Sequence, residues 1–173
     1  MKSENALPNV IEQLRCALQQ DEFWNAYLDG ITCSFGIHLA VFNEPYLRYL
    51  LDGTKTVESR FSVNRCPPYN RVVSGDLLLL KRAGGPIVGV CFVSAVSSYE
   101  LDPRSWQHIR REYTNALCAQ DPEFWTSRAA AGYATLMHVK NARPVAPLHY
   151  PKRDRRGWVV LQTNSQTLTL QAM

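Results

Sequence analysis

Two cations and a carboxylate lie within six residues of one another in the segment TKTVESRF (54–61), a spacing that suits a site for a charged ligand. Side chains alternate between the two faces of an extended chain, so Thr56, Glu58 and Arg60 are predicted to share one face. Lys55 stands beside the preceding turn and can reach the same side. Lysine and arginine bind phosphate, the arginine through a bidentate fork, and a carboxylate accepts hydrogen bonds from nucleobase amino groups.

The same charged side chains allow two further interpretations. Glu58 can pair with Lys55 and Arg60 on a solvated strand face, where such a pair contributes roughly 0 to 1 kcal/mol. Alternatively, a carboxylate beside a lysine can carry out acid–base chemistry on a bound nucleotide, with the hydroxyl of Thr56 close by. Lys55, Glu58 and Thr56 are therefore the candidate catalytic residues, and spacing alone leaves the three interpretations open.

Charge is unevenly distributed along the chain, whose formal net charge is +4. Residues 140–156 carry six cations against the single acidic side chain of Asp154, whereas residues 1–30 have an excess of acidic side chains. Charge separation of this kind bears on partners and orientation. The basic segment is either a solvated loop or a surface for phosphates, and the acidic N-terminal segment is predicted to cover it when no ligand is bound.

Cations outside the TKTVESRF segment provide further candidate contacts to a nucleic acid. Within KRDRRGW (152–158), three arginines are predicted to bind phosphates without sequence preference, namely Arg153, Arg155 and Arg156. Trp158 begins an apolar run and is predicted to lie in the core rather than on a stacking surface. Lys81, at the end of LLLLKR, is predicted either to project near the mouth of the site or to be a solvated lysine at the end of a strand.

Composition and length restrict the class of protein. The chain has 173 residues, of which 46% are hydrophobic and 20% charged, as expected for one globular domain. Its five cysteines form no CxxC pair and its four histidines no HxxxH spacing, so we expect no metal, no cofactor and no disulfide framework. The sequence also shows no signal peptide and no apolar run long enough to span a membrane. We expect a cytoplasmic monomer.

The hydrophobic pattern predicts an α+β fold. Helical spacing, caps and turn residues predict helices over residues 8–29 (one helix or two shorter ones), 43–53, 102–118 and 121–130. Apolar and alternating runs predict strands over residues 36–42, 56–61, 77–82, 86–96, 133–145 and 157–161, and a weak one over 166–171. Short strands joined by hairpins around a helix favour a small, mixed, partly closed β-barrel.

Four residues of this pattern match a known signature. Gly53, Lys55, Glu58 and Arg60 fit G-x-K-x-x-E-x-R, and with the surrounding strands and the Gly-Gly hairpin the chain resembles the ASCH domain family over roughly residues 37–161. That resemblance implies a PUA-like mixed β-barrel with flanking helices. It divides the chain into an N-terminal helical extension (1–35), an ASCH domain (36–163) and a C-terminal tail or weak strand (164–173).

The resemblance also implies a function. PUA-like barrels are associated with RNA and modified nucleobases, so the expected partner is RNA or a modified nucleoside or nucleotide, held in a cleft lined by the motif residues. Some ASCH members are amidohydrolases acting on N4-acetylcytidine, and one resembles a ribonuclease, which makes a hydrolase the alternative. In the amidohydrolases a threonine nucleophile occupies the position of Glu58, and Glu58 has no hydroxyl. A second alternative is a protein-interaction module that docks through the acidic N-terminal helix.

Overall fold

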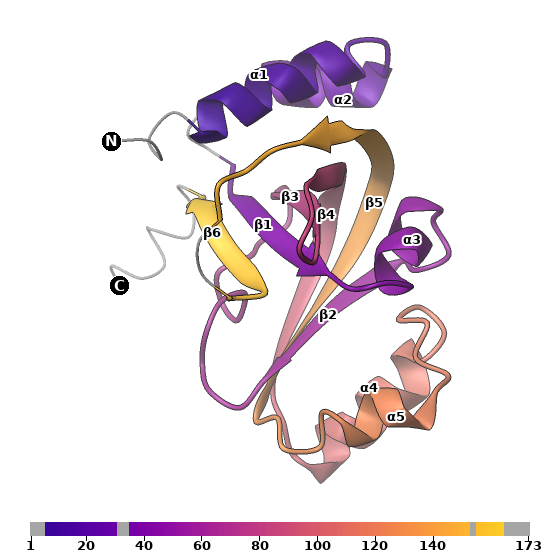
Figure 1. Cartoon of the computed structure of the whole chain (residues 1–173). Coiled ribbons are helices and arrows are strands. Elements are labelled where there is room, and N and C mark those ends of the chain that lie inside the picture. Colours follow the sequence, from indigo (N-terminus) through magenta and orange to yellow (C-terminus); the bar gives the residue numbers. More distant parts are fainter. Residues whose placement is uncertain (1–5, 31–34, 153–154, 165–173) are drawn as a thin grey trace.

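The computed structural model describes residues 6–30, 35–152 and 155–164, which form a curved six-stranded sheet flanked by helices (Figure 1). The helices are α1 (Ala6–Leu18), α2 (Glu22–Asp29), α3 (Tyr46–Leu51), α4 (Pro103–Tyr113) and α5 (Pro122–Thr126). The strands are β1 (Ile37–Phe42), β2 (Val57–Ser62), β3 (Leu77–Arg82), β4 (Ile87–Glu100), β5 (Tyr133–Leu148) and β6 (Trp158–Gln162). The predicted strand at residues 166–171 lies outside the described residues.

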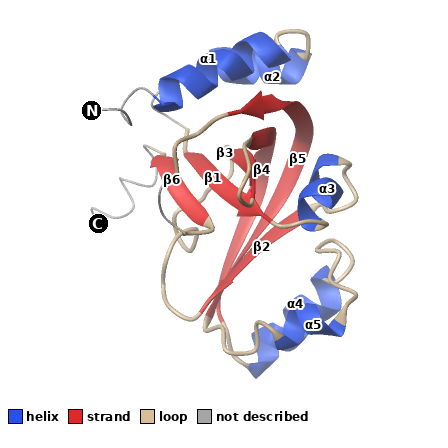
Figure 2. Ribbon diagram, viewed as in Figure 1, coloured by secondary structure: helices blue, strands red, loops and turns tan. Residues whose placement is uncertain are grey.

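The sheet is mixed and open. Its strand order is β2-β5-β4-β3-β1-β6, in which β1 and β3 run parallel and all other neighbours run antiparallel. Figure 2 shows the strands curling into part of a barrel, with β2 and β6 as the two edges. This is the α+β arrangement that the hydrophobic pattern predicted. The sheet stays open, because β2 and β6 do not pair with each other in the described part of the chain.

Two strands are longer than predicted. β4 continues past residue 96 to Glu100 and β5 continues past residue 145 to Leu148. The two strands pair along most of this length, with register shifts that allow them to bend across the barrel. The connection between them holds α4 and α5, so this helix pair lies at one end of the molecule, opposite α1 and α2 (Figure 1).

The N-terminal helices pack on the body of the domain. The predicted helix at residues 8–29 is interrupted between Leu18 and Glu22, where the Asp21 side chain accepts a hydrogen bond from the N–H of Trp24 and caps α2. Trp24 is fully buried and its indole N–H donates to the carbonyl of Asn141 (2.8 Å). The apolar faces of α1 and α2 share one buried cluster with β1 and β3, so they are covered by the sheet.

Two further clusters form the rest of the core. One lies under α3 and includes Leu50, Leu78 and Trp158, whose predicted place in the core is thereby confirmed. The other joins α4 and α5 to β2 and β5 through side chains such as Ile109 and Trp125. Within the described part of the chain, no helix is both long and apolar enough to cross a bilayer.

Candidate functional site

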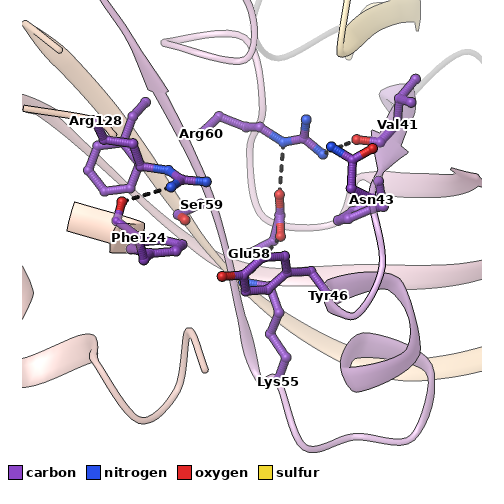
Figure 3. A pocket seen from close by; sticks show the side chains of 11 residues that line it. Val41, Asn43, Tyr46, Lys55, Glu58, Ser59, Arg60, Phe124 and Arg128 are labelled. Atoms are coloured by element: carbon purple, nitrogen blue, oxygen red, sulfur yellow. Dashed lines mark hydrogen bonds and ion pairs between the residues drawn. The ribbon is translucent and has the colours of Figure 1, made fainter. Parts of the chain in front are cut away.

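The residues of the TKTVESRF segment border a hollow of about 280 Å³ between the edge strand β2 and the end of β1. We call this hollow the Glu58 pocket. Its charged lining consists of Lys55, Glu58, Arg60 and Arg128, and Figure 3 shows Arg60 directed toward Val41 and Asn43, with Glu58 between Arg60 and Lys55. Its remaining walls are mostly aromatic or polar and are formed by Val41, Phe42, Asn43, Tyr46, Ser59, Phe61 and Phe124.

The turn at Gly53 and the start of β2 determine where the motif side chains point. Gly53 has a φ of +83°, a left-handed conformation that favours glycine, and no neighbour restricts the turn there. The Asp52 side chain accepts from the N–H of Thr54 (2.9 Å), and the N–H of Lys55 donates to the carbonyl of Tyr49 (2.8 Å). The chain then enters β2, which pairs only with β5. The end of α3, the turn at Gly53 and the edge strand β2 together direct the motif side chains toward the Glu58 pocket.

Lys55, Glu58 and Arg60 form a charged trio, in which Lys55 and Glu58 are buried and Arg60 is partly buried. The Nζ of Lys55 lies 3.3 Å from Oε2 of Glu58, and the Nε of Arg60 lies 2.8 Å from Oε1. The Lys55 and Glu58 side chains are 2% and 5% exposed. The solvated-face interpretation of the sequence is therefore wrong, because these charges are removed from water and a buried pair is kept only where its members neutralise one another.

Arg60 closes the open barrel. One terminal nitrogen donates to the carbonyl of Val41 in β1 (2.9 Å), and the other donates to the carbonyl of Gly157, the residue before β6 (3.1 Å). Its guanidinium also lies 4.9 Å from the ring centroid of Phe42 and 5.3 Å from that of Trp158. The fork predicted to bind phosphate is thus occupied by backbone oxygens, and Arg60 links β2 to the opposite edge of the sheet.

Arg128 is a pocket cation that the sequence interpretation missed. It stands four residues after Phe124 and donates to the carbonyl of that residue (2.7 Å), while its guanidinium lies 3.9 Å from the ring centroid of Phe124. Burial lowers the pKa of Arg128 below its usual value. The sequence contained a signal for this contact, because residues 124 and 128 are four apart and a helix was predicted over residues 121–130, which puts them on the same side.

Tyr46 provides a hydroxyl next to the trio. Its ring centroid lies 5.7 Å from the Nζ of Lys55, and burial raises the pKa of Tyr46 above its usual value. The tyrosine therefore keeps its proton at neutral pH and can donate a hydrogen bond into the pocket. Lys55 also donates to the carbonyl of Leu117 (3.4 Å), which fixes the ammonium group at the floor of the pocket.

Several predicted site residues lie elsewhere. Thr56 is exposed and precedes the first residue of β2, and it does not line the Glu58 pocket. Lys81 lines a different hollow, at the β3–β4 hairpin with Lys152, and donates to the carbonyls of Arg82 and Gly85. The position predicted for Lys81 at the mouth of the motif site is therefore wrong.

The arginines of the basic segment are only partly described. Arg155 and Arg156 are exposed and directly precede Gly157, whose carbonyl accepts from Arg60. Arg153 lies outside the described residues. Among the described residues, no group of three His, Cys, Asp or Glu side chains converges as ligands for a metal ion.

Comparison with solved structures identifies the fold. The chain superposes on the crystal structure of ASCH from Zymomonas mobilis with a TM-score of 0.59 at 12% identity, over 78% of this chain and 94% of that chain. A tyrosine-to-phenylalanine variant of that protein gives a TM-score of 0.59 at 12% identity, covering 79% and 97%. A serine-to-alanine variant gives 0.58 at 11% identity, covering 79% and 95%.

Comparisons at the level of sequence gave no match, either to a family model or to a curated protein. The likeness is therefore one of architecture, and it extends over almost the whole length of the Zymomonas chains. The curved mixed sheet with its flanking helices is the α+β fold that the sequence resemblance implied. The chain has the fold of an ASCH domain.

Proposed function

We propose that the Glu58 pocket binds one nucleotide unit, either free or within single-stranded RNA. The observation that carries the proposal is the charged trio, with its buried Lys55–Glu58 pair, beneath an aromatic-walled hollow that Arg128 also lines. The volume of about 280 Å³ lies near the lower end of the roughly 300 to 1,000 Å³ of small-molecule sites. That size fits a single base or nucleoside.

Each wall has a role in this proposal. Glu58 accepts hydrogen bonds from a base amino or imino group, because its two oxygens each contact only one cation and a carboxylate has about four acceptor sites. Phe42, Phe61 and Phe124 cover the faces of the base. The phosphate lies toward Arg128, since the terminal nitrogens of Arg60 already donate to backbone carbonyls.

Titration with cytidine and cytidine monophosphate, followed by calorimetry and amide chemical shifts, tests the proposal. We expect saturable binding with shifts at residues 55–60, and tighter binding of the monophosphate. Arg128→Gln should weaken monophosphate binding about tenfold, the effect of losing one charge-assisted hydrogen bond. Arg48→Gln is the matched control, because Arg48 lines a separate hollow beside α3.

Two results would overturn the proposal. One is the absence of saturable binding for any of the four nucleoside monophosphates. The other is an Arg128→Gln protein that is folded, with an unchanged unfolding midpoint, and binds the monophosphate as tightly as the wild type.

Hydrolysis of the bound nucleoside or RNA is a second candidate function. It is favoured by two hydroxyls that line the Glu58 pocket beside the Lys55–Glu58 pair, those of Tyr46 and Ser59. Thr56, the hydroxyl considered from sequence, does not line the pocket. Turnover of N4-acetylcytidine or of a single-stranded RNA, abolished by Lys55→Ala and reduced by Ser59→Ala, would establish this activity, and turnover that survives both substitutions would exclude this site.

A further inference from the structure

A second hollow lies between α4 and α5, on the other side of the aromatic wall of the Glu58 pocket. Its volume is about 440 Å³ and its lining consists of Trp106, Gln107, Arg110, Trp125, Thr126 and Ala129. We call it the α4–α5 groove. Two tryptophans and an arginine on adjacent helices are the residue types that bind unpaired nucleobases, through ring stacking and contacts to the cation.

One layer of rings separates the groove from the Glu58 pocket. Phe61 lines the pocket and stacks on Trp106, with ring centroids 5.2 Å apart and an interplanar angle of 9°. Phe124 also lines the pocket and meets Trp125 edge to face at 5.0 Å. Consecutive residues of α5 thus face two hollows, so a ligand that leaves the pocket over this wall enters the groove.

The groove contains polar groups that the protein does not use. Trp125 is fixed, because its indole N–H donates to the carbonyl of Ala119 (3.0 Å). By contrast, the indole N–H of Trp106 has no acceptor among the described residues. Arg110 lies 5.9 Å from the ring centroid of Trp125 and forms no ion pair with any acidic side chain in the described part of the chain. An unpaired cation beside an apolar groove favours an anionic ligand with a flat apolar part.

We propose that the α4–α5 groove holds a second nucleotide of a single strand whose first nucleotide occupies the Glu58 pocket. The second base stacks against Trp106, and the phosphate joining the two units lies near Arg110 and Arg128. This inference rests on the proposed function of the pocket. It adds that the ligand is an oligonucleotide, because a mononucleotide leaves the groove empty.

Binding measured against oligonucleotide length tests the inference. Fluorescence anisotropy and calorimetry would compare a nucleoside monophosphate, a dinucleotide and a hexanucleotide. We expect the dinucleotide to bind the wild type about tenfold more tightly than the monophosphate, from one added stacked base. Trp106→Leu and Arg110→Gln should each remove most of this gain and leave monophosphate affinity unchanged. Leucine retains apolar volume against Phe61 but has no ring to stack.

Arg111→Gln is the matched control. Arg111 adjoins Arg110 on α4 but pairs with Glu112 (2.6 Å) and does not line the groove, so the length gain should persist in this variant. If Trp106→Leu does not fold, Arg110→Gln and the indole N–H resonance of Trp106 in the wild type provide the same test. That resonance should shift with the dinucleotide and not with the monophosphate.

The outcomes separate the two proposals. If the monophosphate binds in the Glu58 pocket but the dinucleotide binds no more tightly, the groove inference is wrong and the proposed function stands. The same holds if both groove variants keep the gain, as they would if the groove served a protein partner. If the wild type binds neither ligand, the proposed function and the groove inference both fail.

Discussion

Arg60 and Glu58 form the innermost ion pair of the pocket, with 2.8 Å between Nε and Oε1. The same guanidinium donates to Val41 and Gly157, so one side chain neutralises the buried carboxylate and joins the two open edges of the sheet. The contact with Glu58 is ionic rather than a well-aligned hydrogen bond, since the Nε of Arg60 has no partner in hydrogen-bond geometry. Arg60 thus contributes to the fold as well as to the charge of the pocket.

Arg60→Lys should therefore destabilise the protein although it keeps the charge. An ammonium group cannot donate to both carbonyls and contact Glu58 at once, and hydrogen bonds to charged groups contribute about 1.5 to 3 kcal/mol each. We expect the free energy of unfolding in urea to fall by about 2 to 3 kcal/mol. Arg48→Lys, at an exposed cation, should change it by less than about 0.5 kcal/mol. Equal effects at the two positions would show that Arg60 is not a structural link.

Glu58→Gln should lower the free energy of unfolding and raise the preference of the pocket for anionic ligands. The amide leaves Lys55 and Arg60 without a buried anion, and breaking a buried pair costs about 3 to 5 kcal/mol. The more positive pocket should bind anions better, so the ratio of monophosphate to nucleoside affinity should rise about tenfold. Calorimetry with cytidine and its monophosphate measures this ratio.

Glu44→Gln serves as the control for this substitution. Glu44 pairs with Arg82 (3.4 Å) at an exposed site outside the Glu58 pocket, and its loss should change neither stability nor the affinity ratio. If the ratio of monophosphate to nucleoside affinity in Glu58→Gln equals that of the wild type, the phosphate binds too far from the trio to be affected by its charge.

The sequence predicted the trio because its geometry is local. A glycine turn and the two-residue alternation of a strand bring Lys55, Glu58 and Arg60 together without any knowledge of distant segments. The same rule failed at Thr56, since alternation applies only within a strand and β2 begins one residue later. The helix–strand order was likewise predictable from hydrophobic period and caps, whereas the ASCH fold was implied by the resemblance to the family signature.

Long-range contacts could not be predicted in this way. The carbonyl of Gly157 is 97 residues from Arg60, and no periodicity connects the two. Arg128 enters the pocket only because the β4–β5 connection folds back over β2, which depends on where the two long strands stop pairing. Lys81 was misplaced for a related reason, because the β3–β4 hairpin turns it toward the segment before β6.

The N-terminal helices should prove essential to the fold. Trp24 is 0% exposed in a cluster shared with β1 and β3, and replacing a buried tryptophan by alanine costs about 3 to 5 kcal/mol. Trp24→Ala should lower the unfolding free energy by that amount. Phe23→Ala, at a side chain 38% exposed, should cost clearly less. Similar losses would mean that α2 contributes little to the core.

The acidic N-terminal segment is predicted to cover the basic segment, and a point substitution tests this prediction better than a deletion. Deleting residues 1–30 would remove part of the core, whereas the charge contact itself is the pair between Asp21 and Arg143 (2.6 Å). Asp21→Asn should raise the affinity for a short RNA by about twofold at low salt and by nothing at high salt. Fluorescence anisotropy at two salt concentrations measures this effect. An affinity that does not change at low salt would exclude such a cover.

Asp76 connects acid stability to a buried polar network. Its carboxylate is 0% exposed and accepts from Nε2 of His38 (3.0 Å), the N–H of Val73 (2.9 Å), the N–H of Gly36 (2.9 Å) and the amide of Asn164 (3.1 Å). The indole N–H of Trp158 donates to Nδ1 of His38, which leaves Nε2 of that ring to donate to Asp76. The network thus joins β1, the segment before β3, the first residue of β6 and the chain after β6.

The pKa of Asp76 lies below its usual value of 3.8, because the hydrogen bonds from His38, Val73 and Asn164 together outweigh burial, which acts to raise it. A carboxyl group with a depressed folded-state pKa stabilises the protein above the unfolded-state value, and that contribution is lost as pH falls through the folded-state pKa. Asp76→Asn should therefore cost about 3 kcal/mol at pH 7, since an amide cannot accept all of these hydrogen bonds. The difference from wild type, measured by urea unfolding at a series of pH values, should narrow below pH 3.8. Asp29→Asn, at an exposed carboxylate, is the control, and a difference for Asp76→Asn that is constant down to pH 2 would contradict this account.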